Sequence, residues 1–285
     1  MSERIPGSAE DVNGAVDQVT GLDAGLRIAV AAFAAHPRVL VAVDFDGTLS
    51  PLIIDPLKAR AVPGALEALR AAASLGGVTV AIVSGRDLAT LAALTGIGPA
   101  DGVALIGSHG AQISFGEHGG THPASDAGLL DKESTALLSV LRGELAAIRA
   151  RYPAIRLEDK PSAVALHTRG VEPSMAAAAE AAGLEVGARY PDVHVIPGKN
   201  VVELTLVAAT KGSVLLTLAG STGSDATLYV GDDVTDESAF AALDPASGDL
   251  TVKVGDGETL AAHRVPDPES VVRLLELFVD QRRTF

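Results

Sequence analysis

Two carboxylates two residues apart, Asp44 and Asp46, end an apolar run in the segment VDFDGTLS at positions 43–50. The preceding residues, RVLVAV, predict a buried strand, so Asp44 is expected at its C-terminal edge. Like charges this close repel each other, and partial burial disfavours the charged form of each acid. A compensating cation or a shared proton would make the pair tolerable, so the residue types predict metal binding or proton transfer.

Three further motifs carry polar side chains at the ends of apolar runs or at helix starts. They are Ser84-Gly85-Arg86, Lys211-Gly212 and Gly231-Asp232-Asp233-x-x-Asp236. Each alone has an ordinary interpretation: a serine helix cap, a surface lysine, and acids that complement a helix dipole. Together they would assemble an oxygen-rich site for a hard divalent cation beside an anion-binding wall. The set predicts a phosphoryl-transfer site that uses Mg²⁺.

The elements that must position these motifs alternate along the chain. Apolar strands are expected at 39–43, 78–83, 103–106, 226–230 and 250–254, and helices at 26–35, 64–74, 88–94, 212–219, 237–243 and 268–278. This alternation predicts an α/β fold with a doubly wound parallel sheet, Rossmann-like in its core. Ligands bind such sheets at the carboxyl ends of the strands, where all four motifs fall.

The pattern changes in the middle of the chain. Helices are expected at 129–151 and 174–182, and strands at 156–158, 163–168, 193–196 and 201–206. Helix, hairpin, helix, hairpin describes a separate α+β layer. We therefore expect a loose N-terminal arm at 1–25, a catalytic core from 26–113 and 208–285, and an inserted α+β cap domain at 114–207.

Composition narrows the class of partner. The 285 residues carry a net charge of -14, which argues against nucleic acid or an anionic membrane as partner. Cysteine is absent, so a metal would be held by oxygen or imidazole ligands. Apolar runs fall short of the roughly 18 to 20 residues that span a bilayer, and no basic-then-apolar leader opens the chain. A cytoplasmic protein, monomeric and acting on a small molecule, is expected.

The motifs DFDGT, SGR, the lysine before glycine and GDDVTDE, in that order, resemble the four motifs of the haloacid dehalogenase superfamily of aspartate phosphotransferases. The insert lies where that superfamily carries its larger cap type. More closely, the stretches GSHGA (107–111), LEDKPSAVALHTR (157–169) and PGKNVVEL (197–204) resemble cap signatures of the trehalose-6-phosphate phosphatases. The likeness covers about residues 37 to 280. It implies Mg²⁺-dependent hydrolysis of trehalose 6-phosphate to trehalose and phosphate.

The resemblance also implies roles for the core motifs. Asp44 would attack phosphorus to form an aspartyl phosphate, and Asp46 would carry the proton. Ser84 and Lys211 would hold the transferring phosphoryl group. The turn residues expected to donate to phosphate are Gly47 and Thr48. The expected metal ligands are Asp44, the backbone carbonyl of Asp46, and Asp232, with Asp233 or Asp236 acting directly or through water.

In the cap, the resemblance assigns four charged residues to the sugar: Glu158, Lys160, Arg169 and Glu203. Exposed cross-strand charge pairs are the competing interpretation. Further residues expected to face the ligand are Arg86, whose alternative is a surface ion pair, and His109 and Lys199. His167 fits packing equally well. A helical metal pair at His118 and His122 is disfavoured by the two glycines between them.

Alternative functions remain open at this level. They are a phosphatase for another sugar phosphate such as sucrose phosphate or mannosyl-phosphoglycerate, a sugar phosphomutase, and a non-catalytic sugar-phosphate-sensing or synthase-tethering subunit. The family often places an aromatic-Asp pair before the motif lysine, whereas this chain reads Ala208-Ala209-Thr210, which leaves helix capping to Thr210. We expect a free-standing phosphatase, with a trehalose-phosphate synthase as a candidate partner.

Overall fold

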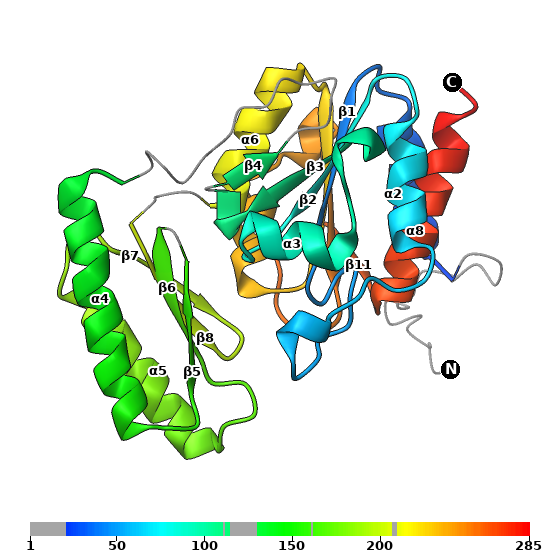
Figure 1. Cartoon of the computed structure of the whole chain (residues 1–285). Coiled ribbons are helices and arrows are strands. Elements are labelled where there is room, and N and C mark those ends of the chain that lie inside the picture. The colour runs from blue at the N-terminus through cyan, green and yellow to red at the C-terminus, as the bar shows by residue number, and fades with distance from the viewer. Residues whose placement is uncertain (1–20, 111, 115–129, 161, 207–209) are drawn as a thin grey trace, which may run out of the picture.

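A computed structural model describes residues 21–110, 112–114, 130–160, 162–206 and 210–285. Two sheets organise these residues (Figure 1). The larger, the core sheet, has seven strands in the order β11-β10-β9-β1-β2-β3-β4. The smaller has four strands in the order β5-β6-β8-β7, and with its two helices we call it the cap.

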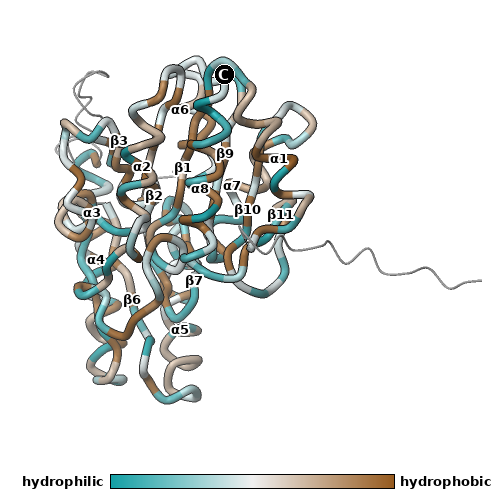
Figure 2. The backbone as a smooth tube through the Cα atoms, turned by 90° about the vertical axis from the view of Figure 1, so that its right-hand side faces the viewer, coloured by the Kyte–Doolittle hydropathy of each residue, from teal (hydrophilic) through white to brown (hydrophobic). Residues whose placement is uncertain are grey.

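The core sheet is parallel except at one edge, where β4 runs antiparallel to β3. Its strands are β1 (Val39–Asp44), β2 (Val78–Val83), β3 (Val103–Gly107), β4 (Gln112–Ser114), β9 (Ala226–Gly231), β10 (Leu250–Val254) and β11 (His263–Val265). All six residues of β1 are buried, as a central parallel strand covered on both faces requires. The backbone trace is coloured hydrophobic along much of β1, at the centre of this sheet (Figure 2).

Helices cover both faces of the core sheet. They are α1 (Ala24–Ala34), α2 (Ala65–Ala73), α3 (Leu88–Thr95), α6 (Lys211–Thr222), α7 (Glu237–Ala242) and α8 (Pro268–Arg282). The first three and α8 pack on one face, and α6 and α7 on the other. Aspartates cap several of them: the Asp87 side chain accepts from the Thr90 amide, and the Asp267 side chain from the Ser270 amide.

Successive side chains of each core strand point to opposite faces of the sheet. In β1, Val39, Val41 and Val43 join the cluster under α1, α2 and α8, whereas Leu40 and Ala42 join the cluster under α6 and α7. Asp44 continues the second series, so the strand itself directs this carboxylate toward α6.

The cap is built by the same alternation. Its helices are α4 (Lys132–Arg151) and α5 (Pro173–Ala188), and its strands are β5 (Arg156–Asp159), β6 (Ala163–His167), β7 (His194–Gly198) and β8 (Val201–Thr205). Val164 and Leu166 of β6 pack under the helices. The other face carries His167 on β6 and Glu203 on β8. This polar face borders the core.

Most predicted elements occur within a few residues of their expected bounds, with some differences. α1 begins at Ala24, and Leu22 is 1% exposed, so core packing begins before the expected end of the N-terminal arm. α5 continues six residues past its expected end at 182. The predicted start of α4 at 129 lies outside the described residues, as do His118 and His122.

The C-terminal helix α8 is joined to the start of the core. The Arg282 guanidinium donates to the carbonyls of Ala34 (2.8 Å), Pro37 (2.6 Å) and Gly76 (3.0 Å), and also to that of His36. One side chain thereby satisfies carbonyls at the end of α1 and in the turn before β2. Across the described part of the chain, no helix combines the length and apolarity needed to cross a membrane.

Candidate active site

The centre of the site is an ion pair at the end of β1. Lys211, the first residue of α6, donates from Nζ to Asp44 Oδ1 at 2.7 Å and to Asp236 Oδ1 at 2.6 Å. All three side chains are nearly inaccessible, at 3%, 5% and 0% exposure for Lys211, Asp44 and Asp236. Gly212 lets α6 start this close to α7, because a Cβ there would lie 2.2 Å from the Ser238 carbonyl oxygen.

Burial and charge set the protonation of this group. Burial raises the pKa of Asp44 well above its usual range; Lys211 opposes this rise, and the nearby Asp236 and Asp232 add to it. Burial alone would lower the pKa of Lys211, but the two carboxylates outweigh it and raise that pKa. Lys211 therefore stays charged, and Asp44 needs further positive charge to ionise readily.

Asp236 is engaged by donors from three elements. Besides Lys211, its Oδ1 accepts from the Tyr229 hydroxyl at 2.6 Å, and its Oδ2 accepts from the Asp233 amide at 2.8 Å. Burial would raise the pKa of Asp236, but Lys211 and these hydrogen bonds lower it. Burial and the carboxylates raise the pKa of Tyr229 well above its usual range, so its hydroxyl remains a donor.

Asp232 follows β9 and lies against the turn after β1. Gly47 adopts a φ of +83°, and a Cβ there would lie 2.0 Å from Asp232 Oδ2, so glycine is required twice over. Burial, then Asp236 and Asp233, raise the pKa of Asp232 to about 7. Its Oδ1 is buried and has no hydrogen-bond partner among the described residues. Lys253 of β10 donates to the Asp232 backbone carbonyl.

The donor set suits a hard divalent cation. Asp44, Asp232 and Asp236 each offer a carboxylate oxygen within 4.8 Å of the others. Oxygen ligands are those that Mg²⁺ prefers, and the unpartnered Asp232 oxygen and the raised pKa values of Asp44 and Asp232 indicate missing positive charge. The residues present therefore fit Mg²⁺.

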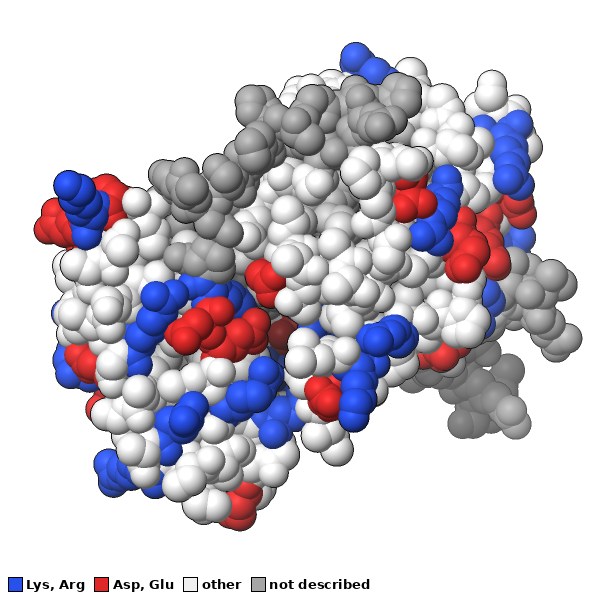
Figure 3. Space-filling model, in the orientation of Figure 1, with Lys and Arg blue, Asp and Glu red and all other residues white. Residues whose placement is uncertain are grey.

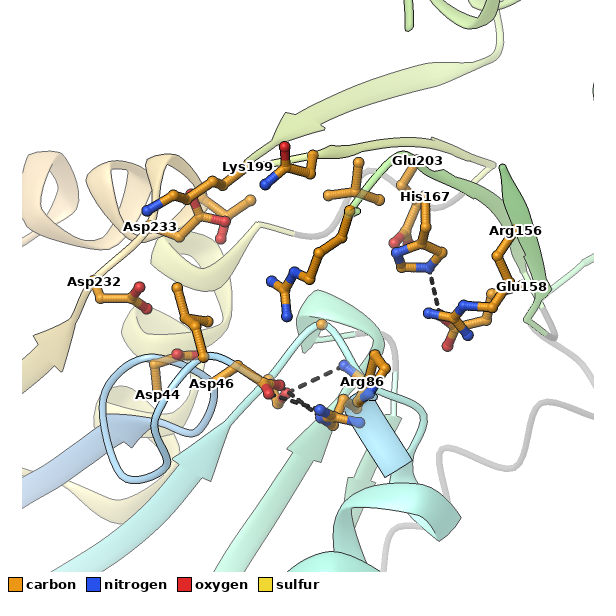
Figure 4. Close-up of a pocket in the computed structure, with 18 of the residues that line it drawn as sticks. Asp44, Asp46, Arg86, Arg156, Glu158, His167, Lys199, Glu203, Asp232 and Asp233 are labelled. Carbon is orange, nitrogen blue, oxygen red and sulfur yellow. Dashed lines mark hydrogen bonds and ion pairs between the residues drawn. The ribbon is translucent and has the colours of Figure 1, made fainter. Parts of the chain in front are cut away.

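The Asp46 carboxylate forms an ion pair with Arg86. Both of its carboxylate oxygens accept from Arg86, at 2.6 Å from Nε and 2.6 Å from Nη2 (Figure 4). This is the bidentate geometry that guanidinium and carboxylate favour. The Arg86 guanidinium also lies over the Phe45 ring, 5.8 Å from its centroid. A surface ion pair was the alternative interpretation of Arg86 from the sequence. Arg86 does form an ion pair, but its side chain is only 12% exposed.

Ser84 and Thr48 are buried hydroxyl residues in the segments that follow β2 and β1. Ser84 directly follows β2, is 1% exposed, and accepts from the Arg86 amide at 3.2 Å. Thr48 is fully buried, and its Oγ1 has no hydrogen-bond partner among the described residues. His109 belongs to a 3₁₀ turn, η3 (Ser108–Gly110), after β3; its side chain is outside the described part.

The cap contributes charged side chains from its polar face. Lys160 is 5% exposed and donates to the Gly85 carbonyl at 2.5 Å and to Glu203. His167 Nε2 lies 2.7 Å from Glu158 Oε2. Burial would raise the pKa of Glu158, but the His167 hydrogen bond and the charge of Lys160 lower it.

A second contact joins the cap to the core: Arg169 donates to the Ile53 carbonyl at 2.7 Å. Lys160 and Arg169 thus contact the segments that follow β2 and β1, which also carry Arg86 and Asp46. In the space-filling view, acidic and basic side chains gather where the cap meets the core (Figure 3).

A cavity of about 200 Å³ separates the cap from the strand ends. Asp44 and Asp232 lie at one end, and Glu158, His167 and Arg156 at the other (Figure 4). The predicted site residues that line it are Asp44, Asp46, Ser84, Arg86, Glu158, Lys160, Arg169, Lys199, Glu203, Lys211, Asp232 and Asp233. Asp236, Gly47 and Thr48 lie behind these, within the walls.

Sequence reasoning missed several residues of this site. From the sequence, Tyr229 and Lys253 look like ordinary strand residues. In the structure, the side chains of both donate hydrogen bonds to the acidic turn, to Asp236 and to the Asp232 carbonyl. Arg156 also lines the cavity, and its position two residues before Glu158 on one strand was the available signal. Leu52 and Ile54 are apolar residues that also line the cavity, and nothing in the sequence indicated that they would.

Known proteins are similar to this chain over both its core and its cap. The model of the trehalose-phosphatase family matches residues 42–267, which span the four core motifs and the cap. A curated trehalose-phosphate phosphatase of Mycobacterium tuberculosis is 32% identical over 252 residues, covering 84% of this chain and 61% of the relative. The chain thus spans about three fifths of the length of that relative.

Solved structures share the fold. The C-terminal domain of Candida albicans trehalose-6-phosphate phosphatase superposes with a TM-score of 0.78 at 22% identity, covering 94% of this chain and 99% of that one. A haloacid dehalogenase-like hydrolase from Bacillus subtilis gives a TM-score of 0.57 at 19% identity, covering 83% and 98%. The doubly wound α/β fold is therefore that of haloacid dehalogenase-like hydrolases.

Proposed function

The chain belongs to the trehalose-phosphatase family, and from this premise we propose that it hydrolyses trehalose 6-phosphate to trehalose and phosphate with Mg²⁺. The observation that carries the proposal is the buried Asp44–Lys211 pair at 2.7 Å, at the strand-end side of a cavity covered by a polar cap. A carboxylate beside a fixed cation, facing such a cavity, suits attack on a phosphate monoester.

In the proposed reaction an Asp44 oxygen attacks phosphorus, the bond between phosphorus and the sugar oxygen breaks, and an aspartyl phosphate forms. Asp46 gives its proton to the departing sugar oxygen, and then takes a proton from the water that hydrolyses the intermediate. Lys211 and Ser84 bind the phosphoryl oxygens. Because Arg86 donates to both Asp46 oxygens, it disfavours a proton there, so we propose that this ion pair loosens when Asp46 carries the proton.

Asp44 and Asp232 are proposed to hold the metal ion, with the backbone carbonyl of Asp46. Mg²⁺ would supply positive charge that offsets the acids and polarises the phosphate. Asp236 lies within 4.8 Å of both acids but already accepts three hydrogen bonds, whereas Asp233 lines the cavity; one of these two is proposed to complete the site directly or through water.

The cap is proposed to recognise the sugar. A disaccharide offers many hydroxyls and little apolar surface, so charged groups should bind it through strong hydrogen bonds. Four candidates line the cavity from the cap side: Glu158, Lys160, Arg169 and Glu203. Lys160 and Arg169 already contact core carbonyls, so the cap stands close to the strand ends and would exclude water when substrate is bound.

The test is phosphate release from a panel of sugar phosphates, with and without Mg²⁺, by the wild type and by Asp44→Asn. We expect Mg²⁺-dependent turnover that is fastest for trehalose 6-phosphate and at least about 10³-fold slower in the variant. Faster turnover of sucrose 6-phosphate or mannosyl-phosphoglycerate would reassign the substrate. Full activity of Asp44→Asn would remove Asp44 as nucleophile.

We also propose that the protein acts as a monomer and that a trehalose-phosphate synthase is its candidate partner, since such an enzyme would produce its substrate. Light scattering would report the mass in solution. Co-elution of the two proteins in size-exclusion chromatography, compared with each alone, would test the association.

A further inference from the structure

Tyr229 is a fully buried residue that the proposed chemistry leaves unused. It lies on β9 two residues before Gly231, so both face α6 and α7. The chain then returns through a 3₁₀ turn, η4 (Val234–Asp236), which brings Asp236 back against the strand. A Cβ on Gly231 would lie 2.3 Å from Asp236 Cγ, so glycine makes room for the carboxylate beside Tyr229.

The Tyr229 hydroxyl and the Lys211 ammonium share one acceptor. Both donate to Asp236 Oδ1, each at 2.6 Å, while the Asp233 amide holds Oδ2 at 2.8 Å. The carboxylate orientation is therefore fixed from β9, from α6 and from Asp233, the residue that precedes η4. Lys211 reaches Asp44 from this fixed point and lines the cavity.

We propose that Tyr229 is a positioning residue, which acts through Asp236 to hold the Lys211 ammonium where it meets both Asp44 and the transferring phosphoryl group. The proposal rests on the proposed function. Without the hydroxyl, Asp236 Oδ1 keeps Lys211 as its one described side-chain donor. The carboxylate then keeps two of its three donors, the Asp233 amide and Lys211, and its hold on the ammonium beside Asp44 is less rigid.

The substitution Tyr229→Phe removes the hydroxyl and keeps the ring, whose centroid lies 5.8 Å from that of Phe240. The chain also offers a matched control. In the cap, the Tyr190 hydroxyl donates to Glu144 Oε1 at the same 2.6 Å, so Tyr190→Phe removes a hydrogen bond of the same type and length at a more exposed place remote from Asp44. Tyr190→Phe therefore shows what losing such a bond costs away from the site.

The kinetic test measures kcat and KM for trehalose 6-phosphate in the wild type and both variants. We expect Tyr229→Phe to lower kcat at least about tenfold, with a smaller change in KM because the cap residues are intact. Tyr190→Phe should keep kcat within about twofold. A folded Tyr229→Phe variant with kcat within about twofold of the wild type would overturn the proposal.

Binding of inorganic phosphate, followed by calorimetry in the presence of Mg²⁺, requires no turnover. We expect at least about fivefold weaker binding in Tyr229→Phe and unchanged binding in Tyr190→Phe. Equal affinity in the wild type and Tyr229→Phe would contradict the positioning of Lys211, even if trehalose 6-phosphate proves not to be the substrate.

A double-mutant cycle on phosphate binding separates positioning from a purely structural role. Tyr229 and Lys211 meet only through Asp236, so a tyrosine that acts through the lysine has no effect on phosphate binding once the ammonium is removed. We expect Tyr229→Phe to weaken phosphate binding at least about fivefold in the wild type and less than about twofold in Lys211→Met. The same loss in both backgrounds would overturn the proposal.

Discussion

Replacing Asp232 with Asn should stabilise the metal-free protein, and increasingly so as pH rises. Burial, with Asp236 and Asp233 nearby, raises the Asp232 pKa to about 7, against about 3.9 in an unfolded chain. Between these values the unfolded chain releases the proton while the folded protein keeps it. Stability is therefore lost as pH rises from about 4 through about 7, and the full cost is present above that window.

The size of the effect follows from the same two values. A difference of about 3 pH units at about 1.4 kcal/mol per unit gives roughly 4 kcal/mol at pH 8, and about 1.5 kcal/mol at pH 5. Asn carries no charge and escapes this cost, although its buried amide offsets part of the gain. The stability advantage of Asp232→Asn should therefore grow by about 2 to 3 kcal/mol between pH 5 and pH 8.

Urea unfolding in EDTA at the two pH values measures this difference directly. Asp192→Asn, which alters an exposed carboxylate, serves as the control and should show little change at either pH. Added Mg²⁺ should stabilise the wild type more than Asp232→Asn, because the variant lacks a charged ligand. An advantage that is equal at pH 5 and pH 8, or a variant less stable than the wild type at pH 8, would refute the reasoning.

Other substitutions test separate parts of the structure. Lys211→Met should destabilise the metal-free protein by about 3 to 5 kcal/mol in urea unfolding, because it leaves two buried carboxylates without their cation; a loss below about 1 kcal/mol would contradict the buried pair. Gly47→Ala should abolish the Mg²⁺-induced rise in melting temperature, since its Cβ would displace the Asp232 carboxylate; an unchanged rise would show that the turn adapts. Arg282→Ala should cost about 2 kcal/mol, measured by thermal unfolding, because several carbonyls lose their donor; Arg283→Ala, on the exposed end of α8, is its control and should be near neutral.

The core strands were predictable because a parallel strand buried on both faces reads as a continuous apolar run, as β1 and β2 do. The length of α5 was not. Gly183 directly follows the predicted end, but Gly183 and Gly187 lie where the helix approaches its sheet: a Cβ on Gly187 would be 2.3 Å from Val195 Cγ2. β4 and β11 have three residues each, too few to form a pattern.

For the site, sequence reasoning placed the strand-end motifs but not their pairing. The bidentate hold of Arg86 on Asp46 depends on side-chain directions in two neighbouring turns, which spacing does not encode. Tyr229 looked like a core residue, because its hydroxyl partner arrives only when η4 folds back. The roles of the cap residues in binding sugar remain predictions.

The order of the core strands has a consequence for the newly made chain. β1 lies between β2, which follows soon after it, and β9, which follows the entire cap. During synthesis the cap can complete its own sheet while β1, all six residues of which are buried in the finished protein, still has one apolar edge unpaired. Such edges invite pairing with other chains. Among the strands made before the cap, the one that carries Asp44 is therefore the one whose edge waits longest for its partner.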